Sequence, residues 1–129
     1  MKRSLYLAVL LIAALAPAAA RAQALDAGVQ LFKAKKYAEA MTYFSQYAEK
    51  NPEAAYYMGR IAGAQNQDSA VEWFEKAMKM NPNSSVYMDW YGRGLADQAS
   101  RASKFKLPFL APKIKGAFEK AVALDPNNI

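Results

Sequence analysis

The side chains that most often do chemistry in proteins are sparse in this sequence of 129 residues. It contains no cysteine and no histidine, which excludes disulfides, thiolate metal sites and the commonest general base. Carboxylates remain, and Glu72 and Glu75 lie three residues apart. Lys76 and Lys79 follow them at helical spacing, which is typical of a solvated helix face with local ion pairs. These carboxylates are therefore not arranged for acid–base catalysis.

Two other patterns fall short of a catalytic or phosphate-binding site. Gly92-x-Gly94 is a glycine pair inside a helical pattern, with no preceding strand to form a phosphate-binding loop. Ser84 and Ser85 stand where a helix needs an N-cap, and no base lies near them in the sequence. We therefore predict that the protein is not an enzyme and uses no cofactor or metal ion.

The first residues have the order of a secretory signal peptide. Two basic residues precede 13 mostly apolar residues (5–17), and small residues follow up to Ala24. The alternative is a membrane anchor, but the apolar run is shorter than the roughly 20 residues that a membrane span needs. We expect residues 1–24 to be removed by cleavage after Ala22 or Ala24, and the protein to be periplasmic or secreted.

The net charge gives little indication of the partner. The formal charge is +6, and removal of Lys2, Arg3 and Arg21 with the leader would leave 14 basic against 11 acidic residues. This balance is ordinary for a protein surface, so partners must be inferred from where the charges cluster. Export and the mild charge both argue against a nucleic-acid partner.

The elements that would position any site are repeated helices. The second half of AVEWFEKAMKMNPN, residues 70–83, recurs as FEKAVALDPNN from Phe118, and a weaker copy precedes Pro52. Apolar residues fall at helical spacing through each copy, and Asn-Pro or Asp-Pro ends it. The predicted helices run over about 25–34, 37–50, 54–64, 69–80, 84–100 and 112–124.

These residues resemble the tetratricopeptide repeat (TPR) family, over residues 25–129. The family pattern has a glycine on the first helix, and alanine, an aromatic residue, alanine and proline on the second. The first-helix glycines are Gly28, Gly59 and Gly92, spaced 31 and 33 residues apart. The second-helix matches are Ala40, Phe44 and Pro52, then Ala70, Phe74, Ala77 and Pro82, then Phe118, Ala121 and Pro126.

The resemblance implies an all-α fold, a right-handed α-solenoid of about three helical hairpins. The hairpins would cover about 25–52, 53–82 and 83–126, the third with an insertion of about ten residues between its helices, judged against the 34-residue period. Tyr47 and Ile114 depart from the small residues that the pattern expects. We expect the aromatic residues at helical core spacing to pack inside the fold, namely Phe44, Trp73, Phe74, Tyr91 and Phe118.

TPR proteins hold an extended peptide or a partner's helix in a concave groove lined by the first helices, and the resemblance implies such a groove here. The groove positions carried over by register are Val29, Phe32, Lys33, Tyr56, Arg60, Asp89 and Arg93. Arg60 and Arg93 each follow their repeat glycine, in MGR and YGR. Stacked as a short ladder, they would bind a carboxylate or an acidic segment through paired N–H donors. The alternative is an intramolecular pair between Arg93 and Asp89.

The insertion, RASKFKLPFLAPKIK at residues 101–115, is a second candidate surface because it is basic and aromatic and contains no acid. A loop of this composition can dock on an anionic membrane or an acidic protein. It can also fold its aromatic residues back under the preceding helix as a packed loop, and this structural interpretation is the one that we favour. The candidate docking residues are Arg101, Lys104, Phe105, Lys106 and Phe109.

Together these features predict a non-catalytic protein–protein interaction module of the cell envelope, which binds a partner protein or peptide in its groove. One alternative is a self-associating or truncated repeat array. Val122 and Leu124 lie on the far side of the last helix, and no capping helix follows in this sequence, so that face would be open to a second copy. Another alternative is an accessory subunit of an envelope enzyme.

Overall fold

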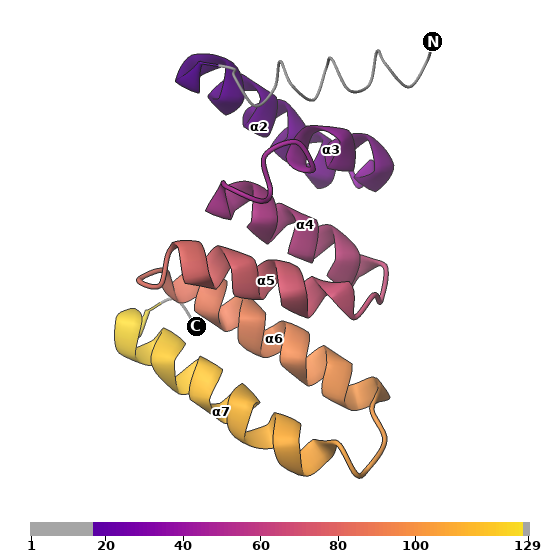
Figure 1. The fold of residues 1–129 in the computed structure, drawn as a ribbon, viewed down its shortest axis with the longest axis vertical. Helices are drawn as coiled ribbons and strands as arrows, with labels where there is room; N and C mark the ends of the chain where they lie inside the picture. The colour runs from indigo at the N-terminus through magenta and orange to yellow at the C-terminus, as the bar shows by residue number, and fades with distance from the viewer. Residues whose placement is uncertain (1–16, 128–129) are drawn as a thin grey trace.

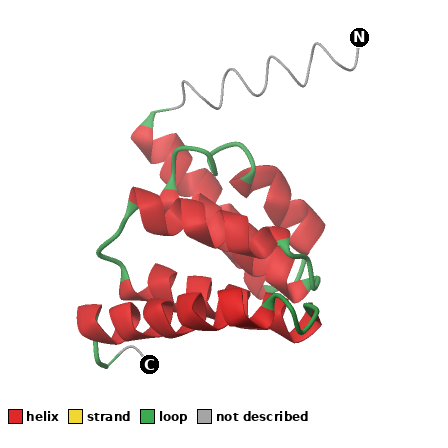
Figure 2. Ribbon diagram, turned by 60° about the horizontal axis from the view of Figure 1, so that its bottom comes forward, coloured by secondary structure: helices red, strands yellow, loops and turns green. Residues whose placement is uncertain are grey.

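The protein folds as a stack of α-helices. The computed structural model describes residues 17–127, and within them it contains six helices and no strand (Figure 2). The helices follow one another from α2 at the top of Figure 1 to α7 at the bottom. Their bounds are α2 Ala18–Lys33, α3 Tyr37–Phe44, α4 Pro52–Ala64, α5 Ser69–Met80, α6 Ser85–Arg101 and α7 Leu107–Leu124. The apolar run of the predicted signal peptide lies, apart from Pro17, outside the described residues.

Neighbouring helices of the described chain pair into three hairpins, α2 with α3, α4 with α5 and α6 with α7. The contacts of α5 with α6, and the weaker contacts of α3 with α4, stack each hairpin on the next. Each helix therefore packs mainly on its neighbours in sequence, as in repeat proteins. The all-α stack of hairpins confirms the predicted fold class.

The turns within the first two hairpins share one geometry. Lys35 and Asn66 have left-handed backbones, with φ of 60° and 58°. In both turns the next amide donates to the carbonyl five residues earlier, at 2.9 Å. This pattern satisfies a carbonyl at the helix end and reverses the chain. The break predicted between the helices at 54–64 and 69–80 is confirmed.

Side chains cap the first helices of the second and third hairpins. The Asn51 side chain accepts a hydrogen bond from the Ala54 amide at 3.0 Å. Pro52 occupies the first turn of α4, where a backbone N–H has no partner within the helix, so the N–H that proline lacks costs no hydrogen bond. The Ser84 hydroxyl accepts from the Tyr87 amide at 3.2 Å, as its predicted capping role requires. The starts of α4 and α6 thus follow from residue type, although α4 begins two residues before the predicted start at residue 54.

The second helix of the first hairpin is shorter than predicted. We expected it over 37–50, but α3 ends at Phe44. Beyond it the Tyr47 amide donates to the Phe44 carbonyl at 3.0 Å, and the Lys50 amide to the Tyr47 carbonyl at 3.1 Å. These bonds span three residues, so the segment forms successive turns. Ala48 is nevertheless fully buried, so the turns still pack against the core.

The second helix of the third hairpin is longer than predicted. We expected it to begin near Pro112, but α7 begins at Leu107 and contains Pro112. Pro108 lies in the first turn of α7, the position that we had assigned to Pro112. The extra residues of this hairpin therefore lengthen its helices, and only 102–106 connect α6 to α7.

One contact recurs inside every hairpin: a first-helix glycine meets a phenylalanine of the second helix. A Cβ added to each of these glycines would lie 2.6–2.8 Å from the nearest ring atom, closer than side chains normally approach. The glycines are there because only a residue without a side chain leaves room for the ring. The pairs are Gly28 with Phe44, Gly59 with Phe74, and Gly92 with Phe118.

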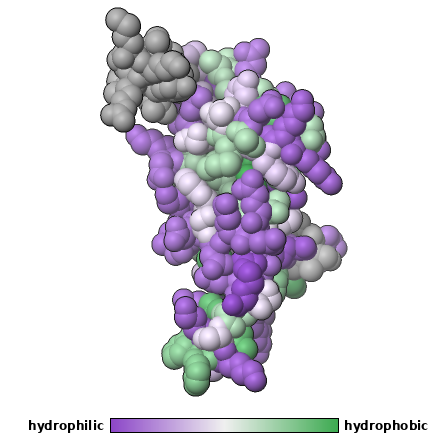
Figure 3. Space-filling model, turned by 90° about the vertical axis from the view of Figure 1, so that its right-hand side faces the viewer, coloured by the Kyte–Doolittle hydropathy of each residue, from purple (hydrophilic) through white to green (hydrophobic). Residues whose placement is uncertain are grey.

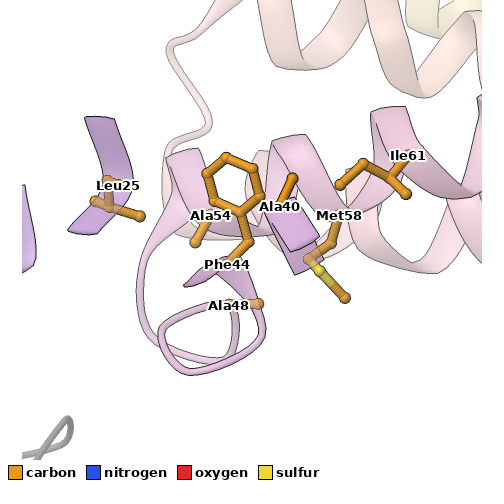
Figure 4. Close-up of a cluster of buried hydrophobic side chains, with 7 residues drawn as sticks. All are labelled: Leu25, Ala40, Phe44, Ala48, Ala54, Met58 and Ile61. Atoms are coloured by element: carbon orange, nitrogen blue, oxygen red, sulfur yellow. The ribbon is translucent and has the colours of Figure 1, made fainter. Parts of the chain in front are cut away.

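The buried apolar side chains form several small clusters along the stack. The first cluster, shown in Figure 4, contains Leu25, Ala40, Phe44, Ala48, Ala54, Met58 and Ile61. Two further clusters include Phe74 and Ala121. Phe44 and Phe74 are 0% and 2% exposed, which confirms their predicted packing role. Trp73, Tyr91 and Phe118 are only half-buried.

The helices of the described chain were also compared with the length and hydropathy that a membrane span requires. None of them combines sufficient length with sufficient apolar character.

Candidate functional site

A hollow of about 340 Å³ opens among the first helices of the three hairpins. Phe32 of α2 and Arg60 of α4 line it together with Trp90 and Arg93 of α6. Gly63 occupies in α4 the register position that Phe32 has in α2, so the middle hairpin leaves room where the first is bulky. Other lining residues include Tyr37, Ala64, Phe74, Gly94 and Asp97.

Arg60 is held in this hollow by aromatic groups. Its guanidinium carbon lies 3.8 Å from the centroid of the Trp90 ring and 5.0 Å from that of Phe32. Its Nη1 donates a hydrogen bond to the Tyr56 hydroxyl at 2.6 Å. Among residues 17–127, no carboxylate forms an ion pair with it. Arg60 thus has a fixed position, an uncompensated charge and N–H donors to spare.

Arg93 has a different environment although it also faces Trp90, at 5.1 Å from the ring centroid. Its Nε donates to Oδ2 of Asp89 at 2.8 Å, and the Asp89 side chain is only 6% exposed. The arginine therefore neutralises a buried carboxylate on its own helix.

The acid in the lining is ion-paired as well. Asp97 accepts a bond of 2.6 Å from Nη1 of Arg101, and Nη2 of the same guanidinium donates to Asp68 at 2.7 Å. With Arg93 and Asp97 both paired, Arg60 is the only charged lining residue without a charged partner among the described residues. The hollow therefore favours a negatively charged ligand group next to apolar surface.

Tyr56 holds Arg60 from within an aromatic cluster. Its ring centroid lies 4.9–6.3 Å from those of Tyr57, Phe74, Tyr87 and Trp90. Burial raises the pKa of Tyr57 and Tyr87 above the ordinary 10.0, and the charges of neighbouring groups, Glu53 among them, add to the shift. These hydroxyls therefore stay protonated, and the cluster is a neutral support for the arginine.

The predicted groove residues fall into three groups. Phe32, Arg60 and Arg93 line the hollow, and the two arginines meet at the Trp90 ring. Tyr56 and Asp89 lie behind the lining and hold the two arginines. Val29 is half-buried against the first core cluster, and Lys33 is exposed at the end of α2 and does not line the hollow.

Trp90, Tyr37 and Asp97 line the hollow but were missed as site residues. Trp90 was visible in the sequence as a large aromatic residue one helical turn before Arg93. Tyr37 belongs to a second helix, and no groove position is carried over from those helices. Its place depends on the turn at Lys35, which the apolar pattern does not reveal.

The basic and aromatic segment predicted as a docking loop lies at the turn between α6 and α7. Arg101 is the last residue of α6 and is paired with two acids. Phe105 and Phe109 are 88% and 75% exposed, so the alternative in which they fold back under the preceding helix is wrong. Lys106 and Phe109 border a second hollow of about 350 Å³, which Asp68 and Gln98 also line.

The last turn of α7 carries two exposed apolar side chains. Val122 is 45% and Leu124 is 37% exposed.

Within residues 17–127, acidic residues form no group of three or more that could hold a metal ion.

The sequence was also compared with known families and proteins. A family model described as tetratricopeptide repeat matches residues 63–84, which cover the end of α4, the turn and all of α5. The match includes Ala70, Phe74, Ala77 and Pro82, which carried the resemblance of the second hairpin. No curated protein matches the chain. Residues 63–84 thus have the sequence of a repeat that generally mediates binding between proteins.

Proposed function

We propose that this protein is a non-catalytic interaction module of the cell envelope that binds a partner protein or peptide in the hollow between α2, α4 and α6. The observation that carries this proposal is the stacking of Arg60 on Trp90 at 3.8 Å, with no described carboxylate in an ion pair with it. An arginine fixed in this way presents its remaining N–H donors in one orientation. A carboxylate of the ligand would supply the missing partner.

The shape and lining of the hollow narrow the ligand further. A volume of about 340 Å³ is at the lower end for a small-ligand site and suits a few side chains of a bound segment. Phe32, Tyr37 and Trp90 would cover an apolar side chain, while Arg60 binds the acid beside it. The proposed ligand is therefore an extended segment with an acidic group next to an apolar residue.

Export is part of the proposal, and the exposure of the first described residues supports it. Residues 17–23 are all exposed, and the first buried residue of α2 is Leu25. Cleavage after Ala22 or Ala24 would therefore remove no buried side chain. Mass spectrometry of the N-terminus of the protein from its native host tests this part, and an intact Met1 would contradict it.

The binding proposal is tested with Arg60→Gln, which removes the charge and keeps a polar chain. Trp90 and Trp73 are the two tryptophans of the sequence, so in a Trp73→Phe background the fluorescence of Trp90 reports occupancy of the hollow. We expect peptides with an acid beside an apolar residue to change this fluorescence, and peptides with the acid amidated to bind at least tenfold more weakly.

The matched control is Lys50→Gln, because Lys50 is exposed and forms no ion pair with a described residue. Arg60→Gln should weaken both peptide binding and capture of partners from a periplasmic extract, and Lys50→Gln should change neither. Equal binding by the protein and by Arg60→Gln in both assays would refute the proposed site.

Self-association through α7 is the second candidate function, favoured by the exposure of Val122 and Leu124. Two apolar side chains left exposed in the last turn of α7 are suited to an interface between copies. Light scattering over a range of protein concentrations tests it. A mass that rises with concentration and falls in Val122→Ser supports self-association, and a constant monomer mass refutes it.

A further inference from the structure

The connection between α6 and α7, with the first turns of α7, forms a protruding end that we call the tip (residues 102–113). It contains Phe105 and Phe109, the two most exposed large apolar side chains of residues 17–127, together with Leu107 at 40% exposure. Figure 3 shows hydrophobic atoms at the lower end of the molecule, bordered by hydrophilic ones. Isolated exposed apolar residues are common, but two nearly bare phenylalanines four positions apart form a patch.

The core does not explain why this helix begins so early. α7 runs from Leu107 to Leu124, yet its buried residues are Ala117 and Ala121, both in its second half. Apart from its chain neighbours and the backbone of its own helix, no described atom lies within 4 Å of the place where a Cβ of Gly116 would be. The first half of α7 is therefore an ordered helix that contributes no buried residue to the stack.

The charge of the tip is of one sign. Lys104, Lys106 and Lys113 are exposed, and none forms an ion pair with another described residue. Residues 101–115 contain no acid. The positive end of the α7 dipole points to the same place, and no side chain caps it.

We propose that the tip docks the protein on an anionic lipid surface. Phe105 and Phe109 enter the boundary between headgroups and acyl chains, and the three lysines lie among anionic headgroups. The two bare rings beside lysines without acidic partners favour an anionic membrane as the partner. A lipid surface yields to protruding side chains, whereas a protein partner would need a matching pocket for each ring. Docking by the tip is separate from the hollow at Arg60, which would stay open to a soluble partner.

The test uses the protein as purified from an exporting host, its N-terminus read by mass spectrometry, so that every variant shares the same start. Vesicles of equal parts phosphatidylglycerol and phosphatidylcholine are compared with vesicles of phosphatidylcholine alone, by flotation. We expect binding to the anionic vesicles, loss of it at high salt, and little binding to the neutral ones.

Two sets of variants separate the contribution of the lysines at the tip from that of the phenylalanines. Lys104→Gln with Lys106→Gln and Lys113→Gln should weaken vesicle binding about fivefold for each lysine and about a hundredfold together. Phe105→Ser with Phe109→Ser should weaken it at least tenfold. All five side chains are exposed, so circular dichroism and the melting temperature should stay unchanged.

The control for charge is Lys33→Gln with Lys35→Gln and Lys36→Gln, three exposed lysines at the turn between α2 and α3. The control for apolar surface is Val122→Ser. Neither should change vesicle binding by more than about twofold. The proposal is overturned by an absence of binding to anionic vesicles, by equal losses in the control and tip variants, or by full binding after removal of both phenylalanines. The proposal would also be overturned if the unchanged protein did not bind vesicles and the tip variants lost binding to a soluble acidic protein.

Discussion

Gly59 and Gly94 face the two edges of one aromatic ring, that of Phe74. A Cβ at Gly59 would lie 2.6 Å from Cδ1 and Cε1 of the ring, and a Cβ at Gly94 would lie 3.1 Å from Cδ2. Gly59 belongs to α4 and Gly94 to α6, the first helices of successive hairpins. Phe74 of α5 therefore fills the space within its own hairpin and the space between that hairpin and the next.

This arrangement predicts that Gly59→Ala is destabilising. Alanine favours a helix over glycine by about 1 kcal/mol, but the new methyl group must displace a ring that is 2% exposed. Overpacking of this kind costs about 1–3 kcal/mol. Because the methyl group would lie 2.6 Å from the ring, we expect the upper part of that cost and a net loss of about 1–2 kcal/mol in the free energy of unfolding, measured by urea denaturation.

Gly116→Ala is the matched control, because that glycine lies within α7 and its Cβ would have open space around it. It should raise the free energy of unfolding by about 0.5–1 kcal/mol. If Gly59→Ala proved as stabilising as Gly116→Ala, the close contact with Phe74 would be wrong.

The same packing predicts unequal costs for two phenylalanines that occupy equivalent positions. Phe74→Ala should lower the free energy of unfolding by about 3–5 kcal/mol, because it leaves a cavity shared by two hairpins. Phe118 also meets a glycine, but it is only half-buried in the last described hairpin. Phe118→Ala should therefore cost about half as much, and equal costs in urea denaturation would contradict this ranking.

The sequence was sufficient to predict the stack of hairpins, because the spacing of Gly28, Gly59 and Gly92 marks where a second helix must come close. The cap at Ser84 was predicted, since the side chain itself supplies the bond that the helix end needs. Asn51 caps α4 by the same rule, but α4 begins at Pro52, two residues before the predicted start.

The helix ends that were predicted wrongly depend on contacts or positions that local rules do not show. α3 stops at Phe44 although apolar spacing continues to Ala48, because the chain turns while still burying that alanine. Pro112 suits a first helical turn by local rules, but Pro108 takes that position and Pro112 lies inside α7. The exposure of Phe105 also could not be inferred from the sequence, since composition does not distinguish a packed aromatic residue from an exposed one.

Three half-buried tyrosines predict a loss of stability in alkali. Burial raises the pKa of Tyr57, Tyr87 and Tyr91 above 10.0, and nearby Glu53 or Glu75 adds to it. A raised pKa in the folded state means that the folded state binds the proton more tightly. The stabilisation is therefore complete below about pH 10 and is lost as the pH rises through the folded-state pKa values.

Phenolate absorbance in a pH titration measures this effect. We expect part of the tyrosine signal to appear above pH 10.0 in the folded protein and to return to the ordinary range in concentrated urea. A variant with phenylalanine at all three positions should lose the part of the phenolate signal that appears above the ordinary range. Identical titration curves with and without urea would show that burial does not shift these groups.

The last prediction separates the two arginines that look equivalent in the sequence. Arg93 neutralises Asp89, whose side chain is 6% exposed, whereas Arg60 has no carboxylate partner among the described residues. Arg93→Met would leave the buried carboxylate unpaired, so it should lower the free energy of unfolding by about 1–3 kcal/mol. Arg60→Met keeps the contact with Trp90 and should cost less than about 1 kcal/mol.

A double-mutant cycle in urea denaturation tests this division of roles. Asp89→Asn in the Arg93→Met background replaces the stranded charge with a neutral amide, and it should restore at least half of the lost stability. The same change with Arg60→Met should restore none, because Arg60 does not contact Asp89. Recovery in the second pair, or its absence in the first, would show that Arg93 is not the partner that keeps Asp89 buried. If both results hold, Arg93 maintains the fold and Arg60 is the residue left to bind a ligand.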